Sequence, residues 1–572
     1  MSSGTAPEAE ETVTRAGVLT HRQIMVILSG LMLGMLLAAL DQTIVTTSIR
    51  TIADDLDGLS QQAWVTTAYL ITSTVTMPLY GKLSDLYGRK PFYLTAIGIF
   101  IAGSLACTIS TSMGELAAFR AFQGLGAGGL MSLAMAIIGD LVPPRERARY
   151  QGYILAVFAT SSVLGPLIGG FLAGQSSILG ITGWRWVFFV NVPVGIVAFL
   201  VVGKVLNVPH TRREARVDWG GAATLVVTTV PLLLVAEQGR TWGWTSAGSI
   251  SCYVTGAVGL AAWWLTERRM GDDALIPLRL FASTVFSRTA AVSFIIGMGM
   301  FGGMLMIPQY LQIVKGVSPT EAGLLTLPLT AGMIASSLTC GRFISRTGRY
   351  RNLIPLGCTL ITTSMLLFYV FIDVDSPVEE AMAFMVLFGA GLGCCMQTLT
   401  LTIQNAVPPR DMGVATSSAT FFRQIGATAG TAVFFSVLFG TVTTNIGTEL
   451  QEAATSSASF QAALTDPTVM ANPVNQAVAT LLTDPGTVAA TNDSSILTQM
   501  APALARPFEQ GFADSMHLVF LLVAVVVAIG GLLSLTIREV PLRTGSGLED
   551  AKRDRAAEAS EKTAETKERA ED

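Results

Sequence analysis

The sequence predicts an all-α, polytopic membrane protein with two six-helix pseudo-repeats and two helices inserted between them. Three observations support this fold class: the composition, a series of long apolar stretches, and an internal repeat. Of the 572 residues, 51% are hydrophobic and only 13% are charged, and the mean hydropathy is +0.55. Charged residues make up about 25% of an ordinary soluble domain. The composition therefore excludes a soluble globular protein.

Fourteen stretches are long and apolar enough to span a bilayer, which requires about 20 residues. The first follows an acidic leader and is longer than the apolar segment of a signal peptide, so we expect it to remain in the protein. The predicted spans are residues 24–48, 62–81, 92–111, 116–140, 150–174, 186–206, 218–237, 249–267, 287–313, 321–343, 352–372, 378–404, 413–439 and 516–537.

Lysine and arginine residues are concentrated in alternate connections between these spans. The connection at 405–412 is an exception on that side, because it carries only Arg410. Such residues are retained on the cytoplasmic side of a membrane. We therefore expect both termini to be cytoplasmic, in a multi-pass protein of the cell (inner or plasma) membrane. The connections with three or four lysines and arginines are 82–91, 141–149, 204–216, 268–279 and 341–351.

An internal repeat divides the spans into two sets of six. The stretch FQGLGAGGLM at 122–131 matches LFGAGLGCCM at 387–396, and VPPR at 142–145 recurs at 407–410, both at an offset of 265 residues. Two similar halves facing each other are typical of carriers that work by alternating access. In the loop after the second span of each half, Gly81, Gly88 and Arg89 recur 260 positions later as Gly341, Gly348 and Arg349.

The repeat also predicts the division of the chain. We expect a cytoplasmic N-terminal tail, an N-terminal half, a linker with two inserted helices, a C-terminal half and a charged cytoplasmic tail. Within the C-terminal half, the long outer loop 440–515 is rich in Thr, Ala and Ser, and its composition leaves open short helices, a hairpin or a loose loop. The five parts are residues 1–20, 21–206, 207–286, 287–538 and 539–572.

Two charged residues interrupt apolar spans in the N-terminal half. Asp41 follows eighteen uncharged residues, and Arg120 has apolar neighbours on both sides. A charge at the centre of a membrane helix costs about 2.5 to 3.5 kcal/mol on insertion scales, so such residues usually have a function. We expect Asp41 and Arg120 to couple proton and substrate movement. Helical position leaves two candidate partners for Arg120, Asp41 and Asp85.

The loop 81–90, GKLSDLYGRK, is a candidate gate at the cytoplasmic mouth. Gly81 and Gly88 permit close helix approach and an unusual backbone turn. Asp85 can form an ion pair with Arg89 or Lys90. The alternative is that the basic residues only anchor the loop on the inner side. The second copy has Ser345 in place of the acid, so we expect the gate to be asymmetric between the halves.

The fifth span contains a candidate hinge. Gly165, Pro166, Gly169 and Gly170 lie within GPLIGG, where proline removes a helix hydrogen bond and glycine lets a neighbouring helix approach. We expect either a hinge or a leak-preventing contact between the halves, and the alternative is a static kink.

The ninth span predicts an adaptable apolar surface for substrate, because four methionines and Phe301 are interleaved with glycines. A packing helix is the alternative for this span, and solvation of helix ends is the alternative for the polar candidates. Arg423 is a second intramembrane cation. The substrate-lining candidates are Gln123, Met298, Phe301, Gln309, Gln397, Asn405 and Arg423.

Several of these motifs resemble those of the major facilitator superfamily. GKLSDLYGRK resembles its signature loop, RAFQG (120–124) its motif in the fourth helix, and GPLIGG the antiporter motif of its drug exporters. LDQTIV, WRWVFFVNVPVG (184–195) and LIPLRLF (275–281) resemble the fourteen-helix drug:proton antiporters. The resemblance covers roughly residues 20–440 and 516–538, and it implies export of drugs in exchange for protons.

The predicted function is therefore proton-coupled efflux of hydrophobic, cationic drugs or antibiotics by alternating access. The alternatives are a proton-coupled carrier of one siderophore, lipid or other metabolite, and a membrane enzyme or sensor. An enzyme is disfavoured because the spans contain no central histidine, zinc motif or phosphate-binding loop. We expect no catalytic residue, cofactor, metal or nucleic-acid partner. The expected partners of this monomer are the proton, the substrate and the lipid bilayer.

Overall fold

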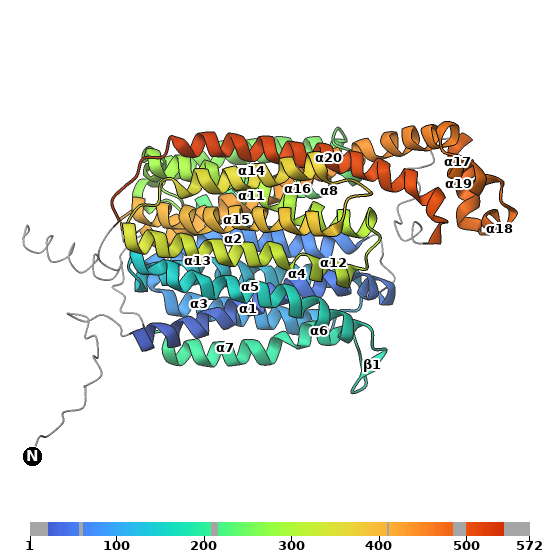
Figure 1. Cartoon of the computed structure of the whole chain (residues 1–572). Coiled ribbons are helices and arrows are strands. Elements are labelled where there is room, and N and C mark those ends of the chain that lie inside the picture. The colour runs from blue at the N-terminus through green and yellow to red at the C-terminus, as the bar shows by residue number, and fades with distance from the viewer. Residues whose placement is uncertain (1–20, 57–60, 208–215, 409–410, 484–498, 543–572) are drawn as a thin grey trace, which may run out of the picture.

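The computed structural model describes residues 21–56, 61–207, 216–408, 411–483 and 499–542, and the predicted tails 1–20 and 543–572 lie outside these ranges. The described chain is a bundle of long helices, which confirms the predicted all-α class (Figure 1). One two-stranded hairpin, β1 (Ser177–Ile178) and β2 (Ile181–Thr182), lies at the end of the bundle opposite the described chain ends. The start of α1 and the end of α20 lie at the same end of the bundle, as an even number of spans requires (Figure 1).

The N-terminal half contains the six predicted spans, the last of which is broken. Val190 separates α6 from α7, so the span 186–206 is a short helix followed by a longer one. The helices are α1 (His21–Asp55), α2 (Gln62–Tyr87), α3 (Arg89–Thr108), α4 (Met113–Leu141), α5 (Pro144–Ala173), α6 (Arg185–Phe189) and α7 (Asn191–Val205).

The C-terminal half also contains six spans, and its second span is preceded by a short helix that Thr326 separates from it. The helices are α11 (Thr284–Ile313), α12 (Pro319–Leu325), α13 (Leu327–Thr347), α14 (Leu353–Phe371), α15 (Val378–Ala406), α16 (Met412–Ser456) and α20 (Pro502–Leu535).

The inserted helices, α8 (Trp219–Trp242) and α9 (Ala247–Met270), pack against each other. The helix α8 also packs on α2 and α16, so the pair lies beside the contact between the two halves. A connector with the short helices η2 (Gly271–Asp273) and α10 (Arg279–Ala282) leads into α11.

Thirteen spans in the described ranges are long and apolar enough to cross a membrane. The predicted fourteenth, α2, is not among them, although it is packed between α4 and α16 in the bundle. Its polar side chains explain this difference, because residues 66–76 include five threonines and a serine. Their hydroxyls bond to carbonyls in the preceding turn, for example Thr74 to Leu70 at 2.7 Å. A span can carry such residues because the helix itself satisfies them.

The internal repeat makes equivalent glycine contacts in the two halves. A Cβ at Gly124 of α4 would lie 2.1 Å from Thr72 of α2, and one at Gly126 would lie 2.5 Å from the Ala96 carbonyl of α3. At an offset of 265, Gly389 and Gly391 of α15 meet α13 and α14 in the same way. The glycines therefore bring each half's fourth helix against its second and third helices.

The segment between the last two spans, predicted as the long outer loop, is helical where the structure describes it. The helix α16 continues to Ser456, and α20 begins at Pro502, so both extend well beyond the predicted spans. Between them, α17 (Ala458–Thr465), α18 (Pro467–Met470) and α19 (Pro473–Thr483) project from the bundle (Figure 1). Phe460, Val478 and Leu504 form part of a separate small core. Residues 484–498 lie outside the described ranges.

Candidate functional site

A buried polar network surrounds Asp41 in the N-terminal half. Asp41 is 0% exposed and Arg120 is 1% exposed. Arg120 donates from Nη1 to Asp41 Oδ2 at 2.6 Å, while Gln123 and Asn191 donate to Oδ1 at 2.9 and 2.6 Å. Of the two partners left open for Arg120, the structure therefore brings Asp41 to it and not Asp85. Three donors from α4 and α7 surround one carboxylate of α1.

Aromatic rings cover the guanidinium of Arg120. Its Cζ lies 4.0 Å from the ring centroid of Tyr69 on α2 and 6.0 Å from that of Phe188 on α6. Rings at these distances attract a cation through their negative faces. Gln123 Oε1 accepts a hydrogen bond from Arg120 Nη1 at 2.6 Å, and Gln123 Nε2 donates to Ser104 on α3 at 2.7 Å. The network thus joins α1, α2, α3, α4, α6 and α7.

Two buried atoms of this network have no hydrogen-bond partner among the described residues. They are Arg120 Nε and Asn191 Oδ1. A buried polar atom left without a partner costs about 1 to 3 kcal/mol. The site therefore holds one unused donor and one unused acceptor next to a fully buried acid.

Sequence reasoning missed three members of this network: Tyr69, Ser104 and Asn191. Asn191 lies in the motif WRWVFFVNVPVG and is the polar residue nearest its centre. That position was a usable signal, because an amide within an apolar span needs a partner. Ser104 and Tyr69 carried no such signal, since serine and tyrosine are common in membrane helices.

The GPLIGG glycines bring α5 against α1, close to Asp41. A Cβ at Gly165 would lie 2.0 Å from Thr43 Oγ1, and one at Gly169 would lie 2.3 Å from Thr47 Oγ1. Gly170 has nothing within 4 Å of its Cβ position, and Pro166 lies inside the helix. The neighbour of Gly165 and Gly169 is thus a helix of the same half, whereas the sequence suggested a contact between halves.

The signature loop forms a latch between the two halves. Asp85 at the end of α2 accepts hydrogen bonds from the backbone N–H groups of Gly413 and Val414, at 3.2 and 2.8 Å. These N–H groups belong to the first turn of α16, where a helix dipole favours negative charge. Arg89 pairs with Asp85 at 2.5 Å and with Asp140 of α4 at 2.7 Å. The latch therefore connects α2, α3 and α4 with α16.

Two glycines make this latch possible. A Cβ at Gly81 would lie 2.0 Å from Ser417 Oγ of α16, so only glycine allows α2 to approach so closely. Gly88 adopts φ 101°, ends α2 and precedes α3. Lys90 takes no part in the latch, because its Nζ donates to Asn207 Oδ1 at 2.7 Å.

The second copy of the loop forms no such latch in the described structure. Gly348 adopts a left-handed conformation (φ 70°) that ends α13, and Gly341 is buried. Arg349 is exposed, and its backbone N–H donates to Thr347 Oγ1 at 3.2 Å. The predicted asymmetry of the gate agrees with this geometry.

The connector of the inserted helices ties into the same latch, which sequence reasoning did not foresee. Arg279 of α10 makes two hydrogen bonds of 2.9 Å with Asp411, the residue before α16. Lys82 of α2 donates to the Asp272 carbonyl at 3.1 Å. The connector therefore contacts α2 in the N-terminal half and the residue before α16 in the C-terminal half.

The substrate-lining candidates on α11 and α16 have different surroundings. Met298 and Phe301 are partly exposed, and Gln309 Oε1 is buried without a partner among the described residues. Arg423 is partly exposed on α16, and the described residues offer it no hydrogen bond or ion pair. It lies eleven residues after Met412, which at 1.5 Å per residue is about 16 Å along the helix.

The two candidates on α15 are tied to other parts of the C-terminal half. Gln397 Oε1 accepts a hydrogen bond from Ser337 of α13 at 2.7 Å. Asn405 donates to the carbonyls of Val540 and Pro541 at 3.0 and 3.2 Å. Asn405 therefore supports the segment after α20.

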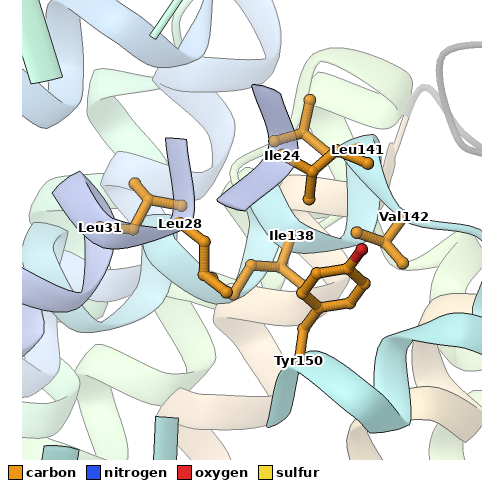
Figure 2. A pocket seen from close by; sticks show the side chains of 7 residues that line it. All are labelled: Ile24, Leu28, Leu31, Ile138, Leu141, Val142 and Tyr150. Carbon is orange, nitrogen blue, oxygen red and sulfur yellow. The ribbon is translucent and has the colours of Figure 1, made fainter. Parts of the chain in front are cut away.

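A narrow apolar crevice lies between α1, α4 and α5, close to the start of α1 (Figure 2). Its lining side chains are apolar apart from the Tyr150 hydroxyl, and no predicted site residue belongs to it. The lining residues are Ile24, Leu28, Leu31, Ile138, Leu141, Val142 and Tyr150.

Comparisons with known proteins agree with this architecture. Residues 31–431 match the family model of the Major Facilitator Superfamily. An uncharacterised MFS-type transporter of Mycobacterium tuberculosis is 35% identical over 546 residues, which cover 95% of this chain and 74% of that protein. The multidrug transporter protein MdtP of Bacillus subtilis is 32% identical over 539 residues, 94% of this chain and 97% of MdtP.

A solved structure shares the fold. The proton:xylose symporter XylE superposes with a TM-score of 0.58 at 14% identity, over 92% of this chain and 98% of XylE. With two repeated halves, a latch between them and a family match over most of its length, this multi-pass membrane protein belongs to the Major Facilitator Superfamily.

Proposed function

We propose that this transporter exports small hydrophobic compounds, including cationic ones, in exchange for protons. The observation that carries the proposal is the ion pair of Asp41 and Arg120, which is buried within a membrane bundle. A buried acid that gains and loses a proton changes the charge of the site without any covalent step. The name of its relative MdtP, a multidrug transporter, supports drugs as the substrate class.

Protonation of Asp41 is the coupling step in this proposal. A proton on the carboxylate cancels its charge and leaves Arg120 as an unpaired buried cation. Breaking a buried ion pair in this way costs about 3 to 5 kcal/mol. A rearrangement of the N-terminal half that exposes Arg120 to water removes this free-energy cost, as does release of the proton. Proton binding on one side thus drives the change of conformation.

One proton supplies enough energy for useful export. Moving one elementary charge across a membrane potential of ~150 mV releases about 3.5 kcal/mol. Since about 1.4 kcal/mol corresponds to a factor of ten, this energy sustains a substrate gradient of roughly a few hundredfold.

The latch at Asp85 closes one end of the bundle. Its contacts with α16 lie at the end of the bundle where both described chain ends lie. With both termini cytoplasmic, as the lysine and arginine pattern predicts, this is the cytoplasmic side. Substrate then enters from the cytoplasm only after the latch opens. A C-terminal green fluorescent protein fusion that stays dark, with an active C-terminal alkaline phosphatase fusion, would contradict this orientation.

The proposed substrate path runs along α11 and α16. Met298 and Phe301 offer adaptable apolar contacts, and Gln309 has an unused acceptor. Arg423 contributes a positive charge about 16 Å from the start of α16. In this proposal the five parts predicted from the repeat, with boundaries near 20, 206, 286 and 538, are the functional units, and a single chain suffices for transport.

The proposal is tested by ethidium efflux from energised cells with and without a protonophore. We expect expression to lower ethidium accumulation several-fold and the protonophore to abolish this difference. Accumulation that responds to neither expression nor protonophore rules out ethidium. The same assay is then run with a panel of hydrophobic drugs. Proton-coupled drug efflux is refuted if none of them is exported, or if the protonophore does not reduce their export.

A further inference from the structure

Asn191 contacts the coupling acid directly and has no role in the mechanism so far. It is the first residue of α7, it is 1% exposed, and its Nδ2 lies 2.6 Å from Asp41 Oδ1. Its own Oδ1 is buried and has no partner among the described residues. Asn191 thus presents a used donor and an unused acceptor at the same carboxylate.

The other side chains bonded to Asp41 offer it donors only. Arg120 has no acceptor atom, and the Gln123 amide oxygen already accepts a hydrogen bond from Arg120 at 2.6 Å. A protonated carboxylic acid carries an O–H that needs an acceptor when it is buried. Among the described side chains bonded to Asp41, Asn191 Oδ1 is therefore the atom free to accept that hydrogen bond.

We infer that Asn191 is a positioning residue that serves both protonation states of Asp41. Its amide N–H donates to the charged carboxylate, and after a turn of about 180° its oxygen accepts the O–H of the neutral acid. The proton comes from solvent on one side, forms the O–H bond at Asp41 Oδ1 and returns to solvent on the other side when that bond breaks, and the hydrogen bond between Asn191 and Asp41 changes direction with it. This inference rests on the proposed proton coupling.

The surroundings of Asn191 confine this change to the amide. The preceding helix α6 is fixed at its start, because Arg185 donates to the carbonyls of Thr108 and Ser110 at 2.6 and 2.9 Å. Trp184 donates to Asp55 of α1 at 2.7 Å. These contacts hold the start of α6 against α1 and the end of α3. The Asn191 amide can therefore turn about its own side-chain bond without movement of α7.

Few other ionisable groups act on Asp41. Arg120 of α4 is its counter-ion, and Tyr69 of α2 and Cys107 of α3 interact with it electrostatically. Arg185 of α6 is used at the end of α3, and the described residues of α5 and α7 place no charged side chain on the carboxylate. A change in the pH dependence of transport on substitution of Asn191 therefore reports on Asp41.

The test compares Asn191→Leu and Asn191→Ala, which remove the amide, with Asn191→Ser, whose hydroxyl can both donate and accept. Transport of ethidium by purified protein in liposomes is measured as a function of pH. Hydrogen bonds to a charged group are worth about 1.5 to 3 kcal/mol and neutral ones about 0.5 to 1.5. The charged form of Asp41 therefore loses more, and the pH of half-maximal exchange should rise by about half to one unit in the Leu and Ala variants.

Asn191→Ser should shift this pH by less than half as much. Asn445→Leu removes an amide contact between α16 and α20 far along the chain and should leave this pH unchanged.

Infrared difference spectra add a second readout: the C=O band of protonated Asp41, assigned by its loss in Asp41→Asn, should move to higher frequency in Asn191→Leu and Asn191→Ala. Because the Ala variant is smaller, it serves if the Leu variant does not fold.

An unchanged midpoint and an unchanged band in the folded Leu or Ala variant overturn the inference, even if the transport rate falls. That result would leave the proposed function intact, because wild-type exchange would still depend on pH. Wild-type transport that is independent of pH and of the proton gradient would instead refute the proposed function itself.

Discussion

The two halves have matching helices but differ at almost every charged position of the proposed mechanism. Arg120 and Gln123 correspond, at an offset of 265, to Met385 and Phe388. Both of these are fully buried in the apolar core of the C-terminal half. The same helix positions thus hold a polar network in one half and hydrocarbon in the other.

The latch shows the same difference. At the offset of 260, Asp85 corresponds to Ser345, and at 265, Asp140 corresponds to Asn405. Arg349 therefore lacks both carboxylates that hold Arg89 in the first copy. Both the coupling acid and the latch acid belong to the N-terminal half. The C-terminal half contributes the backbone N–H groups that receive Asp85 and one unpaired cation, Arg423.

The two membrane arginines illustrate what the difference means. Arg120 is neutralised by Asp41 and covered by two rings, whereas Arg423 has no partner among the described residues. A paired arginine can respond when its acid is protonated. An unpaired one contributes a fixed positive charge. We therefore assign proton coupling to the first half and discrimination by substrate charge to the second.

The largest expected effect follows from breaking the buried pair. Arg120→Gln leaves Asp41 as an unpaired buried charge and should lower the free energy of unfolding in detergent by about 3 to 5 kcal/mol. The double variant with Asp41→Asn should recover most of this loss. Arg423→Gln is the matched control in the other half and should cost less than about 1 kcal/mol, because no pair is broken. Equal losses in both single variants would erase the distinction between the halves.

Much of the fold was predictable from the sequence, and the partners within the site were not. Apolar stretches and the glycine repeat locate the helices and their neighbours, because length and small residues control membrane packing. The choice between Asp41 and Asp85 for Arg120 depends on the rotation of α1 against α4, which one sequence does not specify. Asn191 stands out as an amide within an apolar span, but its contact with Asp41 depends on the break between α6 and α7, which one sequence does not specify either.

The outer segment shows a different limit of sequence reasoning. Its helices α17 to α19 bury a small core outside the bundle. The apolar residues of this core are spread over short helices, so they form only scattered apolar patches in the sequence. For the same reason the ends of α16 and α20 were underestimated, because both helices continue into this core.

The latch gives the next largest effect. Asp85→Asn removes charge-assisted hydrogen bonds to the α16 amides, worth about 1.5 to 3 kcal/mol, so the closed state should lose a factor of roughly ten to a hundred in population. Spin labels at the latch end of α2 and α16 would measure this shift by distance distributions. Ser345→Ala is the control at the equivalent position and should change nothing. A similar shift in both variants would show that the latch is symmetric.

The contact of α5 with α1 should have an intermediate effect. Gly165→Ala places a methyl group 2.0 Å from Thr43 Oγ1, next to Asp41, and overpacking of this kind costs about 1 to 3 kcal/mol. We expect lower thermal stability and slower export. Gly170→Ala in the same motif has nothing within 4 Å and should behave like the wild type. A loss in both variants would point to glycine flexibility in place of close packing.

The smallest effect concerns substrate charge. Arg423→Gln removes a positive charge, which at an effective dielectric of about 20 and a separation of about 10 Å opposes a cation by roughly 1.7 kcal/mol. Since about 1.4 kcal/mol corresponds to a factor of ten, the KM for ethidium should fall by roughly 15-fold, and that for an anionic drug should rise. Arg423→Lys keeps the charge and should retain the wild-type preference. Unchanged KM values for both drug classes would place Arg423 away from the substrate.

The central claim is that Asp41 couples the proton to transport. The most direct measurement compares Asp41→Asn with Asp54→Asn, an exposed acid of the same helix, in liposomes with an imposed proton gradient. The account predicts that Asp41→Asn loses all gradient-driven ethidium accumulation while it still exchanges ethidium at equal concentrations, and that Asp54→Asn keeps both activities. Gradient-driven accumulation by Asp41→Asn at the wild-type rate would contradict the account.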